Sequence, residues 1–273
     1  MNCYATLNDV KADLGITATS EDTNILRYIE AVSRAIDRYC SRRFYVGTET
    51  RYQTPARVFD TTKLMFDDDL LSVTTFSADS EGDGTYDGET WTENTDYWLQ
   101  PFNVFPKLGA ILTAFGNYGF VVTDRYIKVV GNWGYGDGRS ATPYVSASAN
   151  LTATDGSTTA PTVSAIGGIK VGHTLLVESE QIYVSAISGT TLTVRRGMNG
   201  TSGASHAAKA AYIYEYPADI RQFCAWMSAT EFKNRNKGGF MQERMGDYFY
   251  MRMVNDIDKA MLRILGPFIR GTL

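Results

Sequence analysis

The longest run of regularly spaced apolar positions lies in residues 20–43. Its apolar residues are Ile25, Ile29, Val32, Ile36 and Tyr39, spaced four, three, four and three apart. This spacing lines one side of an α-helix, and charged residues take the opposite side. Ser20 is placed to cap the first turn, while Arg42 and Arg43 suit the negative end of the helix dipole. We expect a helix of about 30 Å that forms the central pillar of a helical core.

Further helical patterns occur near both ends of the chain. Thr6 and Asp9 have the spacing of a capping box, and the short apolar stripe after them ends at Gly15. Pro217 suits a first helical position, and a stripe of Ile220, Phe223, Cys224 and Met227 follows it. A last stripe begins after Asn255, a possible cap, and stops at Gly266-Pro267. We therefore expect one helical bundle built from the two terminal segments.

The apolar pattern changes after Phe44 to short β-like runs separated by Gly, Asp, Asn and Pro. Residues 139–165 are rich in Ser, Thr and Ala, and alternating runs at about 145–215 predict a second, accessory β unit. The predicted fold class is α+β, with a helical bundle core formed by the N- and C-terminal segments and interrupted by an antiparallel β module and a second small β insert. The predicted division is residues 1–45 for the N-terminal helices, 46–138 for the antiparallel β module, 139–215 for the Ser/Thr-rich linker and β insert, and 216–273 for the C-terminal helices and tail.

Composition limits the class of protein. A length of 273 residues is enough for two or three modules. The chain is 44% hydrophobic and 21% charged, which is typical of a globular protein. The net charge of -4 argues against a dedicated nucleic-acid binder, which usually carries a basic surplus. No stretch approaches the length of a membrane-spanning helix, and the N-terminus lacks the charged and apolar regions of a signal peptide. The three widely spaced cysteines favour free thiols in a reducing compartment.

Charge is distributed unevenly along the chain. Residues 60–100 hold eleven acidic residues against one basic residue, whereas residues 233–270 hold eight basic residues against four acidic ones. Two interpretations remain open: two solvated faces of opposite sign, or copies and partners that meet acidic patch to basic patch. On the second interpretation, Asp67, Asp68 and Asp69 form an inter-subunit acidic patch. We also expect these three residues to form a tight turn before the strand at 70–78.

Candidate catalytic chemistry is sparse. The chain has two histidines, His173 and His206, and both lie in the β insert, so a histidine-centred triad would need the insert to hold the active site. The Gly-rich stretch at 131–138 lacks the lysine-serine pair and helix start of a phosphate-binding loop. A hydrolase that uses Asp67, Asp68 and Asp69 is disfavoured, because consecutive strand residues point to opposite faces. We expect neither enzymatic activity nor a cofactor.

One acidic loop has ligand-like spacing. Asp79, Glu81, Asp83 and Asp87 take positions one, three, five and nine of a calcium-loop pattern, with Gly84 at position six. Position twelve is Thr90, where the pattern requires a bidentate glutamate. The loop is therefore interpreted either as a weak calcium site or as an acidic β-hairpin tip.

Several stretches, taken in order, resemble the head-tail connector (adaptor) family of tailed bacteriophages. They are YATLNDVKADLGI, DTNILRYIEAVSRAIDRYCSRRFY, VVGNWGYG, PADIRQFCAWMSATEF and ERMGDYFY followed by a closing helix. The resemblance implies a structural protein of the virion neck, assembled in the host cytoplasm. It also implies a homo-oligomeric ring, commonly a dodecamer, on the portal protein. Double-stranded DNA would pass through the ring, including during DNA ejection, without sequence-specific binding. Tail or stopper (head-completion) proteins would attach below the ring.

The resemblance further implies that the C-terminal segment contacts the portal. The candidate docking residues are Phe268, Ile269, Arg270 and Leu273; the alternative is a frayed terminus. A different class of function also stays open, in which the chain is a virion surface-binding protein. Its β insert, with Tyr183, Tyr212 and Tyr214, would then contact carbohydrate or another virion protein.

Overall fold

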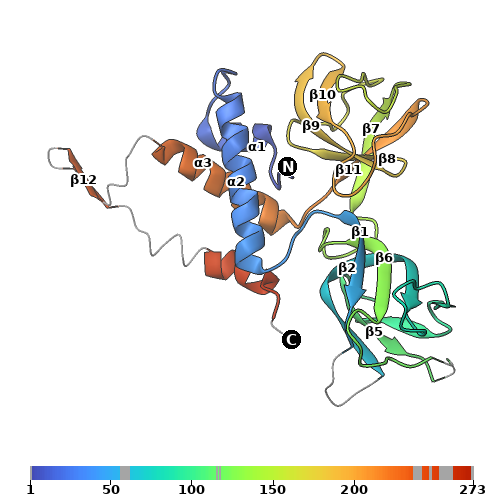
Figure 1. Ribbon diagram of the computed structural model, residues 1–273. Helices are drawn as coiled ribbons and strands as arrows, with labels where there is room; N and C mark the ends of the chain where they lie inside the picture. Colours follow the sequence, from blue (N-terminus) through green and yellow to red (C-terminus); the bar gives the residue numbers. More distant parts are fainter. Residues whose placement is uncertain are drawn as a thin grey trace.

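The computed structural model describes residues 2–55, 62–114, 116, 118–235, 242–245, 248–251 and 261–271. A group of helices lies on one side of the molecule, and two β-sheets lie one above the other on its other side (Figure 1). Among the residues described, no helix combines the length and apolar character needed to cross a membrane.

The predicted fold class is wrong. The part of the chain that the structure describes is mostly β, with 33% strand and 22% helix, and its main elements are two antiparallel sheets rather than a helical bundle core. The apolar stripes correctly predicted helices with one buried face. A stripe indicates only that this face is covered. It does not report that the covering element is another helix, and here sheet residues such as Tyr183 share that role.

The two N-terminal helices are α1 (Leu7–Leu14) and α2 (Asp22–Cys40). The predicted capping box is present, because Thr6 accepts from the Asp9 amide while the Asp9 carboxylate accepts from the Thr6 amide, and Gly15 ends α1 in the left-handed conformation. The predicted cap of the long helix is wrong: its N-cap is Glu21 and not Ser20.

The third helix, α3 (Ala218–Asn234), packs against both α1 and α2. Ile220, Phe223 and Cys224 are buried in the same cluster as Ile25, Ile29 and Ile36 of α2. Residues 261–265 are also helical and lead into the 3-10 helix η1 (Gly266–Phe268), beside the end of α2 (Figure 1). The predicted cap at Asn255 lies outside the described residues.

The first sheet has the order β1-β6-β2-β5-β4, with β3 paired to β2, and all its pairings are antiparallel. Its strands are β1 (Gly47–Gln53), β2 (Lys63–Ala78), β3 (Glu89–Thr90), β4 (Tyr97–Gln100), β5 (Lys107–Leu112) and β6 (Ile127–Trp133). The predicted turn at Asp67–Asp69 is wrong, because β2 runs through these residues as one strand of 16 residues. Trp133, Phe76 and Tyr97 fill the core of this sheet.

The second sheet has the order β10-β9-β8-β11-β7 and is also antiparallel. Its strands are β7 (Tyr144–Leu151), β8 (Thr174–Val177), β9 (Glu180–Ser188), β10 (Thr191–Arg195) and β11 (Lys209–Tyr214). Val46, Leu71 and Tyr214 form a small buried cluster where this sheet meets the first one. A separate two-stranded hairpin, β12 (Gln242–Met245) and β13 (Tyr248–Met251), follows α3.

Candidate functional site

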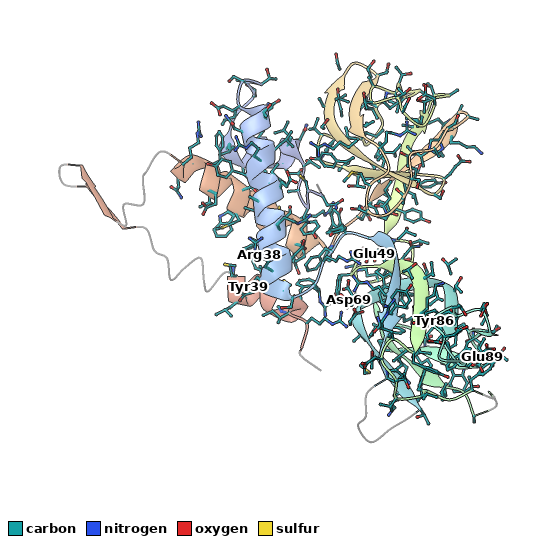
Figure 2. All side chains as sticks on the ribbon, in the orientation of Figure 1. Arg38, Tyr39, Glu49, Asp69, Tyr86 and Glu89 are labelled. Carbon is teal, nitrogen blue, oxygen red and sulfur yellow. The ribbon has the colours of Figure 1, made fainter. Side chains whose placement is uncertain are left out.

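The end of α2, the strand β2 and the C-terminal residues meet at one buried ion cluster. The Asp69 carboxylate has no exposed area, and one of its oxygens lies 3.5 Å from Nε of Arg42. Its other oxygen lies 3.8 Å from Nη1 of Arg270. Neither oxygen has a hydrogen-bond partner among the described residues, so the contacts of the Asp69 carboxylate with these arginines are ion pairs without hydrogen bonds. Asp69 and Glu49 lie on the side of the first sheet that faces the helices (Figure 2).

Asp68 extends this cluster toward β1. Its carboxylate accepts a hydrogen bond of 3.0 Å from Nε of Arg43 and lies 2.9 Å from Nη2 of Arg51. Nη1 of Arg270 lies 3.6 Å from the other oxygen of Asp68. Glu49 contacts both Arg43 and Arg51, so positive and negative groups alternate through the cluster. Hydrogen bonding from Arg43 lowers the pKa of Glu49 below its ordinary value.

The convergence of Asp68 and Asp69 has a backbone cause. Adjacent residues of a regular strand point to opposite faces, which is why the sequence argued against a shared site. The pairing of β2 with β5 shifts register between Met65 and Leu70, and Asp68 and Asp69 are both buried. An irregularity of this kind re-aims side chains, so two consecutive carboxylates can reach the same arginine.

Asp67 differs from its two neighbours because its side chain is 58% exposed. It accepts a hydrogen bond of 2.6 Å from the Gln53 amide and lies 3.4 Å from Nη1 of Arg51. Of the predicted acidic patch, Asp67 is therefore the residue that faces solvent, while Asp68 and Asp69 are buried.

The predicted docking residues lie against this cluster. The Arg270 amide donates to the Cys40 carbonyl at 2.8 Å, and Nη2 of Arg270 donates to the Phe66 carbonyl at 2.6 Å. The Phe268 ring packs edge-on against Phe44 and Tyr135, with ring centroids 5.7 Å apart in both pairs. Ile269, between them, is 43% exposed. Leu273 lies outside the described residues.

Burial governs the ionisation of Asp69. It raises the pKa of the carboxyl, and this outweighs the opposing effect of Arg42 and Arg270, whose contacts are longer than hydrogen bonds. Asp68 also acts to raise this pKa, and Arg43 to lower it. The Asp69 carboxyl therefore gains a proton more readily than an exposed aspartate would.

The residues Arg42, Arg43 and Arg51 were not predicted as site residues. The sequence placed the Arg42-Arg43 pair only as partners of the helix dipole. The available signal was a local excess of each charge: an arginine pair directly follows the longest helix, and a triplet of acids lies in β2. A charge match of this kind suggests pairing but does not say which acid meets which arginine.

The acidic loop at 79–87 uses its carboxylates to hold its own backbone. Asp79 accepts hydrogen bonds from the amides of Asp83 and Gly84, and Asp83 accepts from the amide of Thr85. No group of three or more His, Cys, Asp or Glu side chains in the described part of the chain could hold a metal ion. The bonds within this loop are those of a turn.

A second buried polar cluster centres on Glu180, at the start of β9. Its carboxylate accepts two bonds of 2.7 Å from Arg196, two from the amides of Gly197 and Ala204, and lies 2.8 Å from Nε2 of His206. Burial acts to raise the pKa of Glu180, but these bonds, led by those of Arg196, lower it to about 2. The cluster therefore fixes the loop from 196 to 206 around one carboxylate.

This loop connects the second sheet to the rest of the molecule. Asn199 exchanges hydrogen bonds of 2.7 Å and 3.0 Å with Asn2, and its carbonyl accepts from the Thr48 amide at 2.9 Å. The side-chain Nε2 of Gln181 donates to the Val46 carbonyl at 3.0 Å. Sequence reasoning missed the partners of His206, because Glu180 and Arg196 carry no spacing that marks them.

The three tyrosines proposed for surface binding are not equivalent. Tyr183 and Tyr214 are buried, whereas Tyr212 is 36% exposed. The Tyr212 ring lies 5.6 Å from that of Tyr144, and the neighbouring Val145 is also exposed. Only a small aromatic surface therefore remains on β7 and β11.

Comparison with known families places the N-terminal quarter of the chain. The family model for phage gp6-like head-tail connector proteins matches residues 4–72, a segment that contains α1, α2, β1 and the acidic residues of β2. The resemblance to the connector family is thus confirmed over this segment and indicates a structural connector role in the neck of a phage virion. No curated protein matches the chain.

Proposed function

With residues 4–72 placed in the head-tail connector family, we propose that the chain is a ring-forming subunit of the phage neck. Copies of the chain form a ring on the portal protein, and tail or stopper proteins attach to the other side of that ring. DNA passes through the bore without sequence-specific contacts, which suits the net charge of -4. The subunit assembles in the host cytoplasm and has no catalytic role or cofactor.

The observation that carries the proposal is the position of the matched segment relative to the C-terminal residues. The matched segment supplies Cys40, Phe44 and Asp69. Each of them contacts Phe268 or Arg270 in the C-terminal tail of the chain. These contacts hold the C-terminal tail of the chain in a fixed place on residues 4–72, with the Ile269 side chain exposed. We propose Ile269 as the portal-contacting side chain, and Phe268 and Arg270 as the residues that position it.

The exposed acid of the patch has a separate role in this proposal. Asp67 faces a neighbouring copy in the ring, because its side chain is 58% exposed whereas Asp68 and Asp69 are buried. A charged residue at the rim of an interface contributes more to orientation and association rate than to affinity.

A second candidate function rests on Tyr212. Together with Tyr144 and Val145 it gives the second sheet a small exposed surface that could contact carbohydrate or another virion protein. Burial of Tyr183 and Tyr214 leaves this surface without the larger aromatic platform that the sequence suggested. A glycan-array screen of the wild-type chain against the Tyr212→Ala variant tests this candidate, which requires binding that the variant loses.

The connector proposal is tested by binding to portal-bearing heads. The Ile269→Asp variant and the control Val121→Asp change exposed apolar side chains, 43% and 51% exposed, and Val121 belongs to neither candidate contact surface. Wild type and control should co-sediment with heads, and Ile269→Asp should lose most of that binding. Equal binding by all three proteins would contradict the role of Ile269, and no binding by the wild type would contradict the connector role itself.

A further inference from the structure

A groove runs along α2 where α3 and the C-terminal helical residues flank it. One hollow of about 290 Å³ is lined by apolar side chains that include Ala35, Met227 and Met261. A second hollow of about 400 Å³ is lined by Asn24, Arg27 and Arg235. The two hollows share Tyr28 and Ala31, so they form one continuous groove.

Apolar side chains in the middle of this groove are partly exposed to solvent. Ala31 is exposed and Ala35 is half-buried on α2, while Tyr28 and Met227 are half-buried along the sides. Small side chains on the floor with larger ones at the walls make a channel that another backbone can approach closely. Exposed apolar grooves with polar ends commonly mark interaction sites.

The chain itself points to the occupant. Arg235 and Met261 both line the groove, and the segment 236–260 runs between them. Apolar and aromatic residues are frequent in this segment: Phe240, Met241, Met245, Tyr248, Phe249, Tyr250, Met251, Met253, Val254 and Ile257. The part that the structure describes is the hairpin of β12 and β13, paired from Gln242–Met251 to Met245–Tyr248. A segment with many apolar and aromatic residues therefore connects two residues that line the groove.

The hairpin stands away from its own groove. β12 lies apart from α2 and from both large sheets (Figure 1). An isolated two-stranded hairpin is marginally stable in water, and its outer edges offer unpaired backbone groups. Its length suits the groove, because a strand of four residues spans about 13 Å. The part of α2 from Tyr28 to Ile36 that lines the apolar hollow is about 12 Å long.

Resting on the self-assembly proposed above, we infer that the β12–β13 hairpin of one copy docks into the α2–α3 groove of a second copy. Each subunit then offers one hairpin and one groove, which makes the contact heterologous. A heterologous contact repeated around an axis closes into a ring when the rotation between neighbours allows it. The hairpin and groove thus supply a physical basis for ring closure.

Two variants separate the partners of this contact. Ala31→Arg fills the groove with a long charged side chain at an exposed position, and its control is Thr23→Arg, an exposed residue of α2 outside the groove. Replacing residues 242–251 with a Gly/Ser linker of equal length removes the hairpin. The mass is measured by light scattering under the condition in which the wild type forms rings, either alone or with portal rings. Under that condition each defective variant should fail to form rings, while the Thr23→Arg control should assemble as the wild type does.

Mixing the two defective variants gives the decisive result. The groove-filled copy still has a hairpin, and the hairpin-deleted copy still has a groove, so the mixture should form a dimer of twice the monomer mass that grows no further. Unchanged assembly of either defective variant, or a mixture that stays monomeric, would overturn the inference. Binding of the wild type to portal-bearing heads is measured separately, so failure of the connector role remains distinguishable.

A disulfide test separates a neighbour's hairpin from the chain's own. The double variant Ala31→Cys/Phe249→Cys is oxidised, with the three native cysteines buried and free. Linkage between chains supports the inference, and linkage confined within single chains would overturn it.

Discussion

The guanidinium of Arg270 lies 3.8 Å from the fully buried carboxylate of Asp69. This pair ties the C-terminal residues to the middle of β2. The sequence assigned the two residues to separate surfaces, one for docking and one for contacts between copies. Part of the charge complementarity between the basic C-terminal region and the acidic region is therefore satisfied within one chain.

Arg270→Ala should lower the stability of the protein. The change removes the hydrogen bond to the Phe66 carbonyl and one of the two cations near Asp69, so we expect a loss of about 1–3 kcal/mol in the free energy of unfolding. Urea denaturation measures this loss. The control Arg263→Ala changes an exposed arginine and should stay within about 0.5 kcal/mol of the wild type. Similar losses in both variants would contradict the assigned role of Arg270.

Asp69→Asn should reveal the raised pKa of Asp69. An acid whose pKa is higher in the folded state binds its proton more tightly there, so its contribution to stability is greatest at low pH. That contribution is lost as the pH rises from the ordinary value of 3.8 through the raised one. The free energy of unfolding of the wild type minus that of Asp69→Asn should therefore fall as the pH increases. A difference that rises with pH would contradict burial as the dominant effect, and Asp67→Asn is the control for an exposed aspartate.

Local patterns in the sequence predicted local structure well. The capping box of Thr6 and Asp9, the stop at Gly15 and the helix within 20–43 all depend on residues close together in the chain. The fold class failed, because the relative weight of helix and sheet depends on which apolar faces meet in space. The alternation of apolar and polar residues in short strands is a weak signal, whereas the apolar stripe of one long helix is a strong one.

The site was predicted only in pieces. Its acids and its tail residues were named, but the turn expected at Asp67–Asp69 is a strand with an irregular register. Nothing local to Asp68 or Asp69 indicates that Arg270 is their partner, because contacts between residues distant in the chain depend on the complete fold. The Glu180 cluster was missed for the same reason.

Glu180→Gln should destabilise the second sheet strongly. It leaves the buried Arg196 guanidinium, 7% exposed, without its anionic partner, and breaking a buried pair in this way costs about 3–5 kcal/mol. Glu178→Gln is the matched control, because Glu178 also contacts His206 but is 45% exposed, so its loss should have a much smaller effect. Thermal unfolding compares the two variants. Equal losses of stability in the two variants would contradict the central role of Glu180 in the cluster.

The acidic loop at 79–87 should not bind calcium. Its carboxylates Asp79 and Asp83 already accept backbone hydrogen bonds, and no glutamate stands at position twelve. Calorimetric titration of the chelator-treated protein with calcium should give no binding heat. A saturable heat that Asp79→Asn abolishes would restore the calcium interpretation.

Ring formation on the portal is measured by the mass of the purified protein, alone and mixed with portal rings. Light scattering measures the mass, and negative-stain imaging of the same fractions shows the shape of the particles. A ring-forming connector should appear as rings, either alone or on the portal. A protein that stays monomeric and binds neither portal nor tail proteins would contradict the connector proposal.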